Sequence, residues 1–289
     1  MRVFLYLTIG LLLTTGSALA QTLDEMIKTV QKEYQTIITT SGKVPATLQP
    51  LHLQLSDSEP MVRIRALQGL ALVGGPAAAL LMAPAMGEGT ESSAAVRIEA
   101  ARGLGEVGGQ QALKVLGLGL KDSNPTVRMR VLESLRWAGT VFAVPYINIA
   151  LNGDVEFKDG AWIVHHPQDN MLGVRLQAIR MLRKIGTQFS VQPLADALAG
   201  PRKDGNAAIR KAAADALGEI GKKERDVARD LQFAYENETD MGVKLEIIGS
   251  LGLVRDRAGL PGLQIAMQDP NLTLRMRATQ VYGRILGLQ

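Results

Sequence analysis

Seven acidic and seven basic side chains recur along this sequence at a fixed spacing that could support acid–base chemistry. Each basic residue directly follows an aliphatic residue, here called the anchor, and an acid lies five positions before each anchor. The acids are Asp57, Glu91, Asp122, Asp169, Asp204, Glu238 and Asp269, and the basic residues are Arg63, Arg97, Arg128, Arg175, Arg210, Lys244 and Arg275. Because every repeat carries the pair, we interpret it as a structural ladder. Each carboxylate is expected to cap amide donors at a helix start and to pair with a basic residue of its own or a neighbouring repeat.

Other residues with catalytic or metal-binding potential are few. The sequence has no cysteine, which excludes thiol catalysis and disulfides, and it shows no nucleophile–base constellation or phosphate-binding glycine loop. His165 and His166 are adjacent on a predicted strand, so their side chains point to opposite faces and a shared metal would require distortion. We therefore predict no catalytic residue, no metal, no cofactor and no enzymatic activity.

The anchors require helices to position them. They are spaced by 34, 31, 47, 35, 34 and 31 residues, and apolar residues follow four and eight positions later. That spacing is one stripe of an α-helix. Apolar residues 17, 20 and 24 positions after four of the anchors predict a second helix in the repeat. Two helices per repeat predict an all-α fold, an α-solenoid of about seven helix pairs.

A glycine twelve residues after each of the first five anchors is predicted to end the first helix of the repeat by adopting positive φ. These glycines are Gly74, Gly108, Gly139, Gly186 and Gly221. Arg255 occupies the same position in the sixth repeat. We therefore expect that turn to close differently.

The repeats set the expected domain boundaries. Residues 1–20 form a predicted signal peptide, and residues 21–289 form a single α-solenoid domain. Within that domain we expect an N-terminal helical cap over residues 21–54, repeats 1–3 over 55–151, an insertion over 152–171 and repeats 4–7 over 172–289.

The stretch DGNAAIRKAAADALGEIG, residues 204–221, resembles the HEAT-like repeat, particularly the short form found in phycobilisome lyases. The resemblance covers about residues 55–289. It implies an α-solenoid and is weakly specific for activity, because this repeat occurs in many unrelated binding and assembly proteins.

The long spacing between the third and fourth anchors places extra residues in the insertion. Its Asp159-Gly160 pair is typical of a two-residue hairpin turn, which would place Phe157 opposite Trp162 and Val155 opposite Val164 on one apolar face. Insertions in solenoids often bind ligands, so we predict that Phe157, Trp162, Val164 and His165 contact a partner. Alternatively, the hairpin only covers a widened seam between repeats.

The second helices of repeats 1 to 3 are almost uncharged. Between their inward positions lie Leu81, Val115, Leu118, Tyr146 and Ile149, which we expect to be partly exposed. Exposed apolar surface often marks an interface, so the last four of these complete the predicted partner-binding residues. Tight curvature or docking of the insertion would bury them instead.

The N-terminus predicts export. Arg2 precedes an apolar run, and the segment ends in Ala18-Leu19-Ala20, as in a cleavable signal peptide with a mature N-terminus at Gln21. We therefore expect a periplasmic or secreted protein with no transmembrane segment after cleavage. The net charge of +4 does not support nucleic-acid binding.

These features favour an exported, non-enzymatic scaffold for protein interactions. It would present a concave surface and the inserted hairpin to a protein or peptide partner. One alternative, implied by the phycobilisome lyase resemblance alone, is a lyase or isomerase acting on a bilin or another tetrapyrrole. A second alternative is a structural component of envelope assembly.

Overall fold

The computed structural model describes residues 28, 30–36, 44–158, 161–200, 203–224 and 226–288, without the side chains of residues 140 and 154–166. The predicted signal peptide and the predicted mature N-terminus at Gln21 lie outside the described residues. Within those described ranges, no helix combines the length and the apolar character needed to cross a membrane.

The chain divides into two compact units. The N-terminal unit comprises residues 1–142 and 153–167, and the C-terminal unit comprises residues 143–152 and 168–289. The N-terminal unit contains α3 (Gln49–Gln54), α4 (Pro60–Val73), α5 (Gly75–Leu81), η1 (Ala83–Met86), α6 (Ala94–Val107), α7 (Gly109–Leu118), η2 (Gly119–Lys121), α8 (Pro125–Gly139), β1 (Asp154–Lys158) and β2 (Ala161–His166). The C-terminal unit contains α9 (Val144–Asn152), α10 (Leu172–Ile185), α11 (Gln188–Leu198), α12 (Ala207–Ile220), α13 (Val227–Glu236), α14 (Met241–Val254), η4 (Arg257–Gly259), α15 (Leu260–Ala266) and α16 (Leu272–Leu286), and η3 (Thr140–Ala143) spans the boundary.

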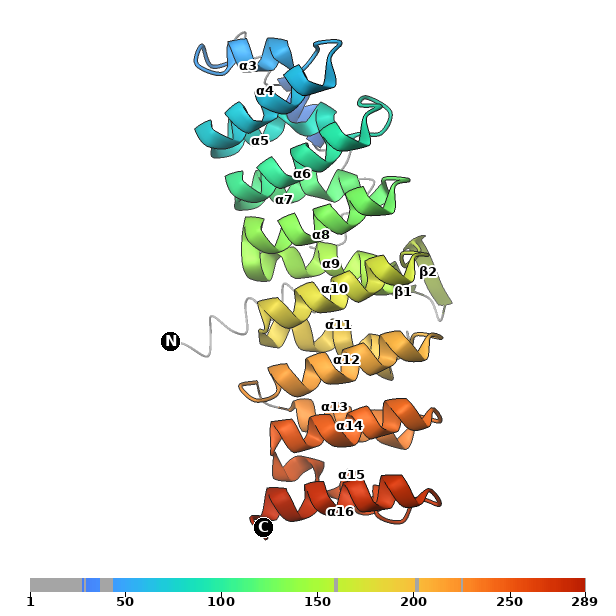
Figure 1. Cartoon of the computed structure of the whole chain (residues 1–289). Helices are drawn as coiled ribbons and strands as arrows, with labels where there is room; N and C mark the ends of the chain where they lie inside the picture. Colours follow the sequence, from blue (N-terminus) through green and yellow to red (C-terminus); the bar gives the residue numbers. More distant parts are fainter. Residues whose placement is uncertain are drawn as a thin grey trace. The chain divides into compact units, whose positions relative to one another are not determined.

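Each unit is a stack of helix pairs. In the N-terminal unit the first helices of the pairs, α4, α6 and α8, pack side by side, and α5 and α7 form a second layer (Figure 1). In the C-terminal unit α10, α12, α14 and α16 form the first layer, and α9, α11, α13 and α15 form the second (Figure 1). Both units are therefore α-solenoid segments, which confirms the predicted all-α class.

The predicted helical stripe forms the core of each unit. The residues four positions after the anchors are all fully buried: Ala66, Ala100, Val131, Ala178, Ala213, Ile247 and Ala278. Five of the seven are alanines, so neighbouring helices can approach closely at this level of the stack.

First helices approach most closely at a glycine nine residues after the anchor. A Cβ atom added at Gly218 of α12 would lie 2.8 Å from the Cβ of Ser250 on α14. At Gly105 of α6 it would lie 3.0 Å from the Cβ of Ser134 on α8. Only a residue without a side chain fits at such a distance. The glycines thus hold successive first helices close enough for ladder side chains to reach the next repeat.

The turns that end the first helices differ from the prediction at three positions. Positive φ occurs at Gly74, Gly108 and Gly186, as predicted, but not at Gly139 and Gly221. Arg255 adopts φ 55° and its N–H donates to the Leu251 carbonyl at 3.0 Å, so the expected different closure at this turn is wrong. The left-handed conformation costs a non-glycine residue roughly 1–2 kcal/mol, which the hydrogen bond and the surrounding packing offset.

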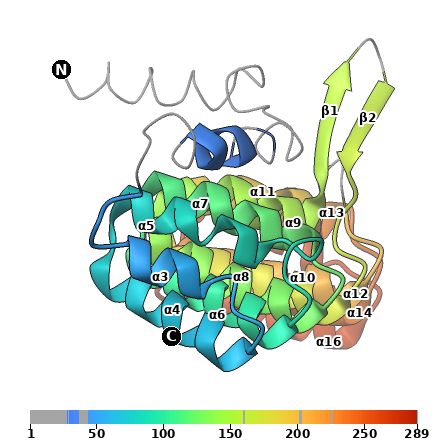
Figure 2. The ribbon, with the colours of Figure 1, turned by 90° about the horizontal axis from the view of Figure 1, so that it is seen from above.

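The insertion contains two antiparallel strands. In the register of β1 and β2, Phe157 lies opposite Trp162 and Val155 lies opposite Val164, with an irregularity between Asp154 and Val155. The two strands lie side by side in Figure 2. The predicted single domain of residues 21–289 stays a prediction.

Candidate functional site

Within each unit, the ladder links neighbouring repeats through a basic residue, and Arg97 shows the geometry. Arg97 Nη1 donates to the backbone carbonyl of Glu91, in its own repeat, at 2.8 Å. Its Nε and Nη2 donate to the two carboxylate oxygens of Asp122, in the next repeat, at 2.5 and 3.0 Å. Both side chains are almost completely buried, at 4% and 1% exposure. A buried ion pair is tolerated when its donors and acceptors are satisfied in this way.

The same arrangement recurs within each unit. Side-chain pairs with the acid of the next repeat are Arg63–Glu91, Arg97–Asp122, Arg175–Asp204, Arg210–Glu238 and Lys244–Asp269. Of the alternatives that the sequence left open, these basic residues pair with the neighbouring repeat, and Arg63, Arg97 and Arg210 also donate to backbone carbonyls of their own repeat.

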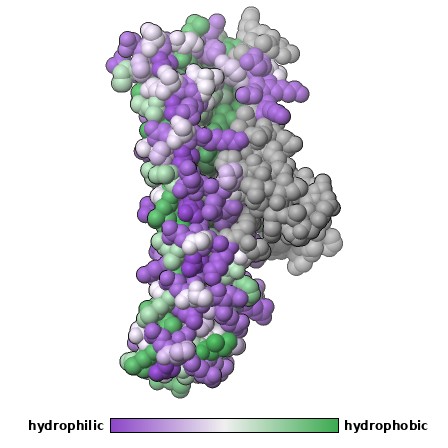
Figure 3. All heavy atoms as spheres, turned by 90° about the vertical axis from the view of Figure 1, so that its right-hand side faces the viewer, coloured by the Kyte–Doolittle hydropathy of each residue, from purple (hydrophilic) through white to green (hydrophobic). Residues whose placement is uncertain are grey.

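All seven ladder acids also accept a backbone N–H from the residue two positions later. These donors are Glu59, Ser93, Asn124, Met171, Asn206, Asp240 and Asn271. Each donor directly precedes a first helix. The carboxylates therefore bind the amide in front of the helix rather than the amides of its first turn. On the described part of the side where first helices begin, hydrophilic residues dominate the visible surface (Figure 3).

The electrostatics of the ladder favour permanent ion pairs. Burial raises the pKa of Glu238, but hydrogen bonds from Arg210 and from the amides of Asp240 and Thr239 outweigh it and lower the pKa to about 2. The hydrogen bonds that Arg97 donates to Asp122 raise the pKa of Arg97. A carboxylate that stays ionised at neutral pH cannot donate a proton as a general acid. The ladder thus has the properties of a structural device.

The uncharged second helices are more buried than predicted. Leu81, Val115 and Ile149 are buried, so the expectation that they are exposed is wrong. Within the N-terminal unit, α7 packs against α5, α6, α8 and η1, which leaves Val115 no free side. Leu118 and Tyr146 are half-buried, and burial raises the pKa of Tyr146 to about 12.

A helical segment near the N-terminus covers part of this layer. Residues 30–36 are helical and lie over α7, as the dark blue coil in Figure 2 shows. Val30 is fully buried, and Glu33 Oε1 lies 3.0 Å from Lys114 Nζ of α7. The Tyr34 ring meets His52 of α3 edge-on at 6.5 Å between centroids, and burial raises the pKa of Tyr34. This contact, which no repeat pattern encodes, was not predicted.

The hairpin residues predicted to contact a partner, Phe157, Trp162, Val164 and His165, lie on β1 and β2, but their side chains are outside the description. Their role in binding therefore stays a prediction. Among the described residues, no group of three or more His, Cys, Asp or Glu side chains is placed to hold a metal ion.

Two exposed aromatic residues of the N-terminal unit were also missed. Trp137, at the end of α8, is 69% exposed, and Phe142 is exposed just after it. The Arg136 guanidinium lies 3.8 Å from the centroid of the Trp137 ring, a cation–π contact that holds the ring in place. Trp137 lies ten residues after its anchor, outside the buried stripe formed by the anchor and the residues four and eight positions after it. This offset is the feature of the sequence that could have predicted an exposed Trp137.

Stacked helix pairs joined by a repeated ion-pair ladder define a helical-repeat protein of the α-solenoid class. Residues 83–157 match the family model of HEAT repeats, and the predicted resemblance to this family is confirmed for that segment. No curated protein sequence matches the chain.

Several solved structures are similar to the chain at low identity. A human deoxyhypusine hydroxylase in complex with glycerol is 19% identical, with 92% of this chain and 96% of that chain covered and a TM-score of 0.39. The CpcE and CpcF complex of phycocyanin lyase from a Nostoc species is 17% identical, with coverages of 84% and 96% and a TM-score of 0.41. A designed armadillo repeat protein is 14% identical, with coverages of 83% and 99% and a TM-score of 0.30.

These matches correct one prediction. Two of the similar structures are enzymes, a hydroxylase and a lyase, so the prediction that the chain has no enzymatic activity does not stand. At these identities the likeness concerns the repeat fold alone and assigns no reaction to the chain.

Proposed function

We propose that the protein is an exported interaction scaffold that binds a protein or peptide through its second-helix layer and its inserted hairpin. The observation that supports the proposal is the helix of residues 30–36 seated on α7. It buries Val30 and places Glu33 against Lys114. The second-helix layer is therefore chemically suited to an amphipathic helix with an apolar face and a flanking acid.

A partner helix would bind α7 by the same contacts. The apolar face would enter the surface that Val30 now occupies, and an acidic side chain would pair with the half-buried Lys114. The chain's own helix would then compete with the partner, so its release would increase partner binding.

A cross-linking and capture experiment in the source cells tests this function. Val30→Asp, which detaches the chain's own helix from α7, should increase the amount of captured partner several-fold. Phe157→Ser with Trp162→Ser should reduce it. Leu253→Ser, which removes an exposed apolar side chain of α14 outside the second-helix layer, is the control and should leave capture unchanged. Equal capture by all variants would contradict the proposal.

Export is tested separately. Cell fractionation should place the protein in the periplasm or medium, and mass spectrometry should find a mature chain beginning at Gln21. A cell-associated chain that retains Met1 would contradict this part of the proposal.

A further inference from the structure

Helix α16 is the first helix of repeat 7. Its exposed side carries the same residue types with which first helices of other repeats contact the next repeat. Among the described residues, α16 packs against α14 and α15. Met276 on its other side is 65% exposed. A Cβ atom added at Gly283, nine residues after the anchor, would meet nothing within 4 Å, whereas the equivalent Gly218 is in close contact with Ser250. We call this open side, which includes Arg275, Met276 and Gly283, the α16 outer face.

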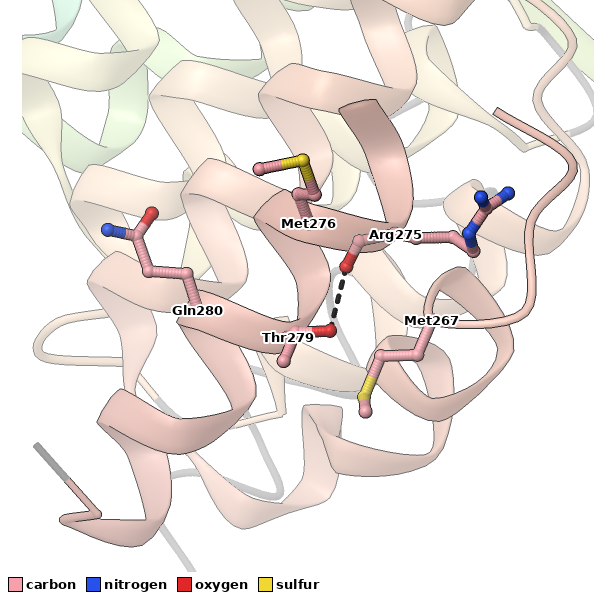
Figure 4. A pocket seen from close by; sticks show the side chains of 5 residues that line it. All are labelled: Met267, Arg275, Met276, Thr279 and Gln280. Carbon is pink, nitrogen blue, oxygen red and sulfur yellow. Dashed lines mark hydrogen bonds between the residues drawn. The ribbon is translucent and has the colours of Figure 1, made fainter. Parts of the chain in front are cut away.

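The α16 outer face carries a shallow, open depression. Met267, at the end of α15, and residues of α16 line a depression of about 520 Å³. Figure 4 shows the lining side chains Met267, Arg275, Met276, Thr279 and Gln280. Thr279 Oγ1 donates to the Arg275 carbonyl at 2.9 Å, so the hydroxyl is already used and the thioethers supply the apolar surface.

Arg275 uses only part of the donor set that the other ladder arginines use. Its Nη1 donates to the backbone carbonyls of Asp269 and Pro270, both at 2.8 Å. In Arg210 the Nε and Nη2 donate to the carboxylate of Glu238 in the next repeat, at 2.7 and 3.0 Å. No described residue supplies such a carboxylate to Arg275. The geometry of Arg210 shows which group fits there: an Asp or Glu in a loop before a helix.

The charge of α16 excludes its pairing with a second α16. The helix carries Arg275, Arg277 and Arg284 and no acidic residue. A symmetric contact between two α16 outer faces would therefore bring like charges together. The partner surface must be acidic.

The opposite end of the ladder offers such a surface. Residues 45–61 contain Asp57 and Glu59 and no Lys or Arg. Asp57 is the first ladder acid, and its Oδ1 accepts the Glu59 N–H at 2.8 Å, as in every repeat. No ladder arginine precedes it in the sequence. Leu53 beside it is 68% exposed, and Met61 is exposed as well, so this surface also has apolar area to bury.

We propose that the α16 outer face of one copy binds residues 45–61 of a second copy, with Arg275 donating to the carboxylate of Asp57. The contact would continue the ladder from one molecule to the next and would cover Met276 and Leu53. Because the two surfaces differ, the contact is heterologous and produces chains or rings of molecules rather than a symmetric dimer. It is independent of partner binding through the second-helix layer.

Sedimentation velocity of the full mature chain over a wide concentration range tests the proposal. The wild-type protein should show mass-action association at low salt. Arg275→Glu and Asp57→Arg should each abolish it, because each places like charges together. The double variant that carries both changes should restore it, since the pair is then reversed. Arg229→Glu, which reverses the charge of an exposed arginine on α13, outside the α16 outer face, is the matched control and should associate like the wild type.

Two results would overturn the proposal: a wild-type chain that stays monomeric at every concentration, or single variants that associate like the wild type. Because Asp57→Arg also removes a loop hydrogen bond, Asp57→Asn is a second variant that keeps an acceptor for the Glu59 amide. It should weaken association about tenfold, the typical effect of replacing a charged hydrogen-bond partner with a neutral one. Thermal melting of each variant checks that it folds.

Discussion

The junction between α12 and α14 and the outer face of α16 carry the same residue types at the same repeat positions, with different surroundings. At the junction, Arg210 binds a buried carboxylate and Gly218 is in close contact with Ser250. On α16, Arg275 has no such carboxylate among the described residues and Gly283 has open space. The comparison shows that these residues become structural only when a further helix pair covers them.

The largest effect should come from removing a ladder arginine at the junction. Arg210→Met leaves the Glu238 carboxylate, now 1% exposed, without its hydrogen-bonded counter-charge and with only Lys203 Nζ at 3.6 Å, and should lower the free energy of unfolding by about 3–5 kcal/mol. Arg275→Met should cost less than about 1 kcal/mol, because no buried charge is left behind. Urea denaturation of both variants under non-associating conditions measures the difference. Similar losses would mean that the backbone contacts of the arginine, shared by both sites, dominate.

Acid should weaken the junction through Glu238. Its folded pKa of about 2 lies below the ordinary value of 4.5, so its contribution is present above about pH 4.5 and is lost as the pH falls towards 2. The shift corresponds to about 3 kcal/mol at full strength. Thermal melting as a function of pH should therefore be flatter for Glu238→Gln than for the wild type between these values.

A control distinguishes this junction from exposed pairs on the same helices. Glu246, whose carboxylate lies 3.7 Å from Lys211 Nζ, forms a more exposed pair. Glu246→Gln should follow the wild-type pH dependence. If Glu238→Gln follows it too, the buried pair is not the source of acid sensitivity.

Replacing the glycine nine residues after the anchor with alanine should change the stability of the protein in opposite directions in the two regions. Gly218→Ala would place a Cβ atom 2.8 Å from that of Ser250 and should destabilise the protein by about 1–3 kcal/mol. Gly283→Ala meets nothing and should stabilise it by about 0.5–1 kcal/mol, because alanine favours the helix. Equilibrium denaturation of the pair decides between these outcomes. Destabilisation by both changes would indicate that α16 is covered in solution.

The smallest effect should come from strengthening the junction next to α16. There Lys244 Nζ, a single point charge, contacts Asp269 Oδ2 at 2.9 Å. In the other four ladder pairs the basic residue is an arginine. Lys244→Arg adds a second parallel donor and should stabilise the protein by about 0.5–1 kcal/mol. A decrease in melting temperature would show that the Tyr235 ring, 5.0 Å from Lys244 Nζ, leaves no room for the larger group.

The sequence predicted the parts of the fold that repeat. Helices and their junctions are defined by three positions of the repeat: the anchor, the residue four positions later and the preceding acid. They are predictable because each position has the same environment in every repeat. Conformations that depend on one local energy balance were not predictable, as Arg255 shows by adopting a positive φ where we expected the turn to close differently.

The candidate site was predicted less well, because burial depends on neighbours that the repeat pattern does not specify. Val115 has the spacing of an outward residue, yet α7 is surrounded by other helices and the side chain is buried. Glu33 and Lys114 are 81 residues apart, and neither belongs to the ladder. The hairpin register follows from a short turn, but nothing in the register states what the hairpin binds.

The ladder also has a kinetic consequence. The two residues of each of the five ladder pairs described above are separated by only 25 to 29 positions in the sequence, from Arg63 and Glu91 to Lys244 and Asp269. Loop-closure entropy depends weakly on length, so each junction has nearly the same cost of forming. Refolding can therefore begin at any of these junctions and spread to its neighbours, and short-range contacts of this kind favour rapid folding.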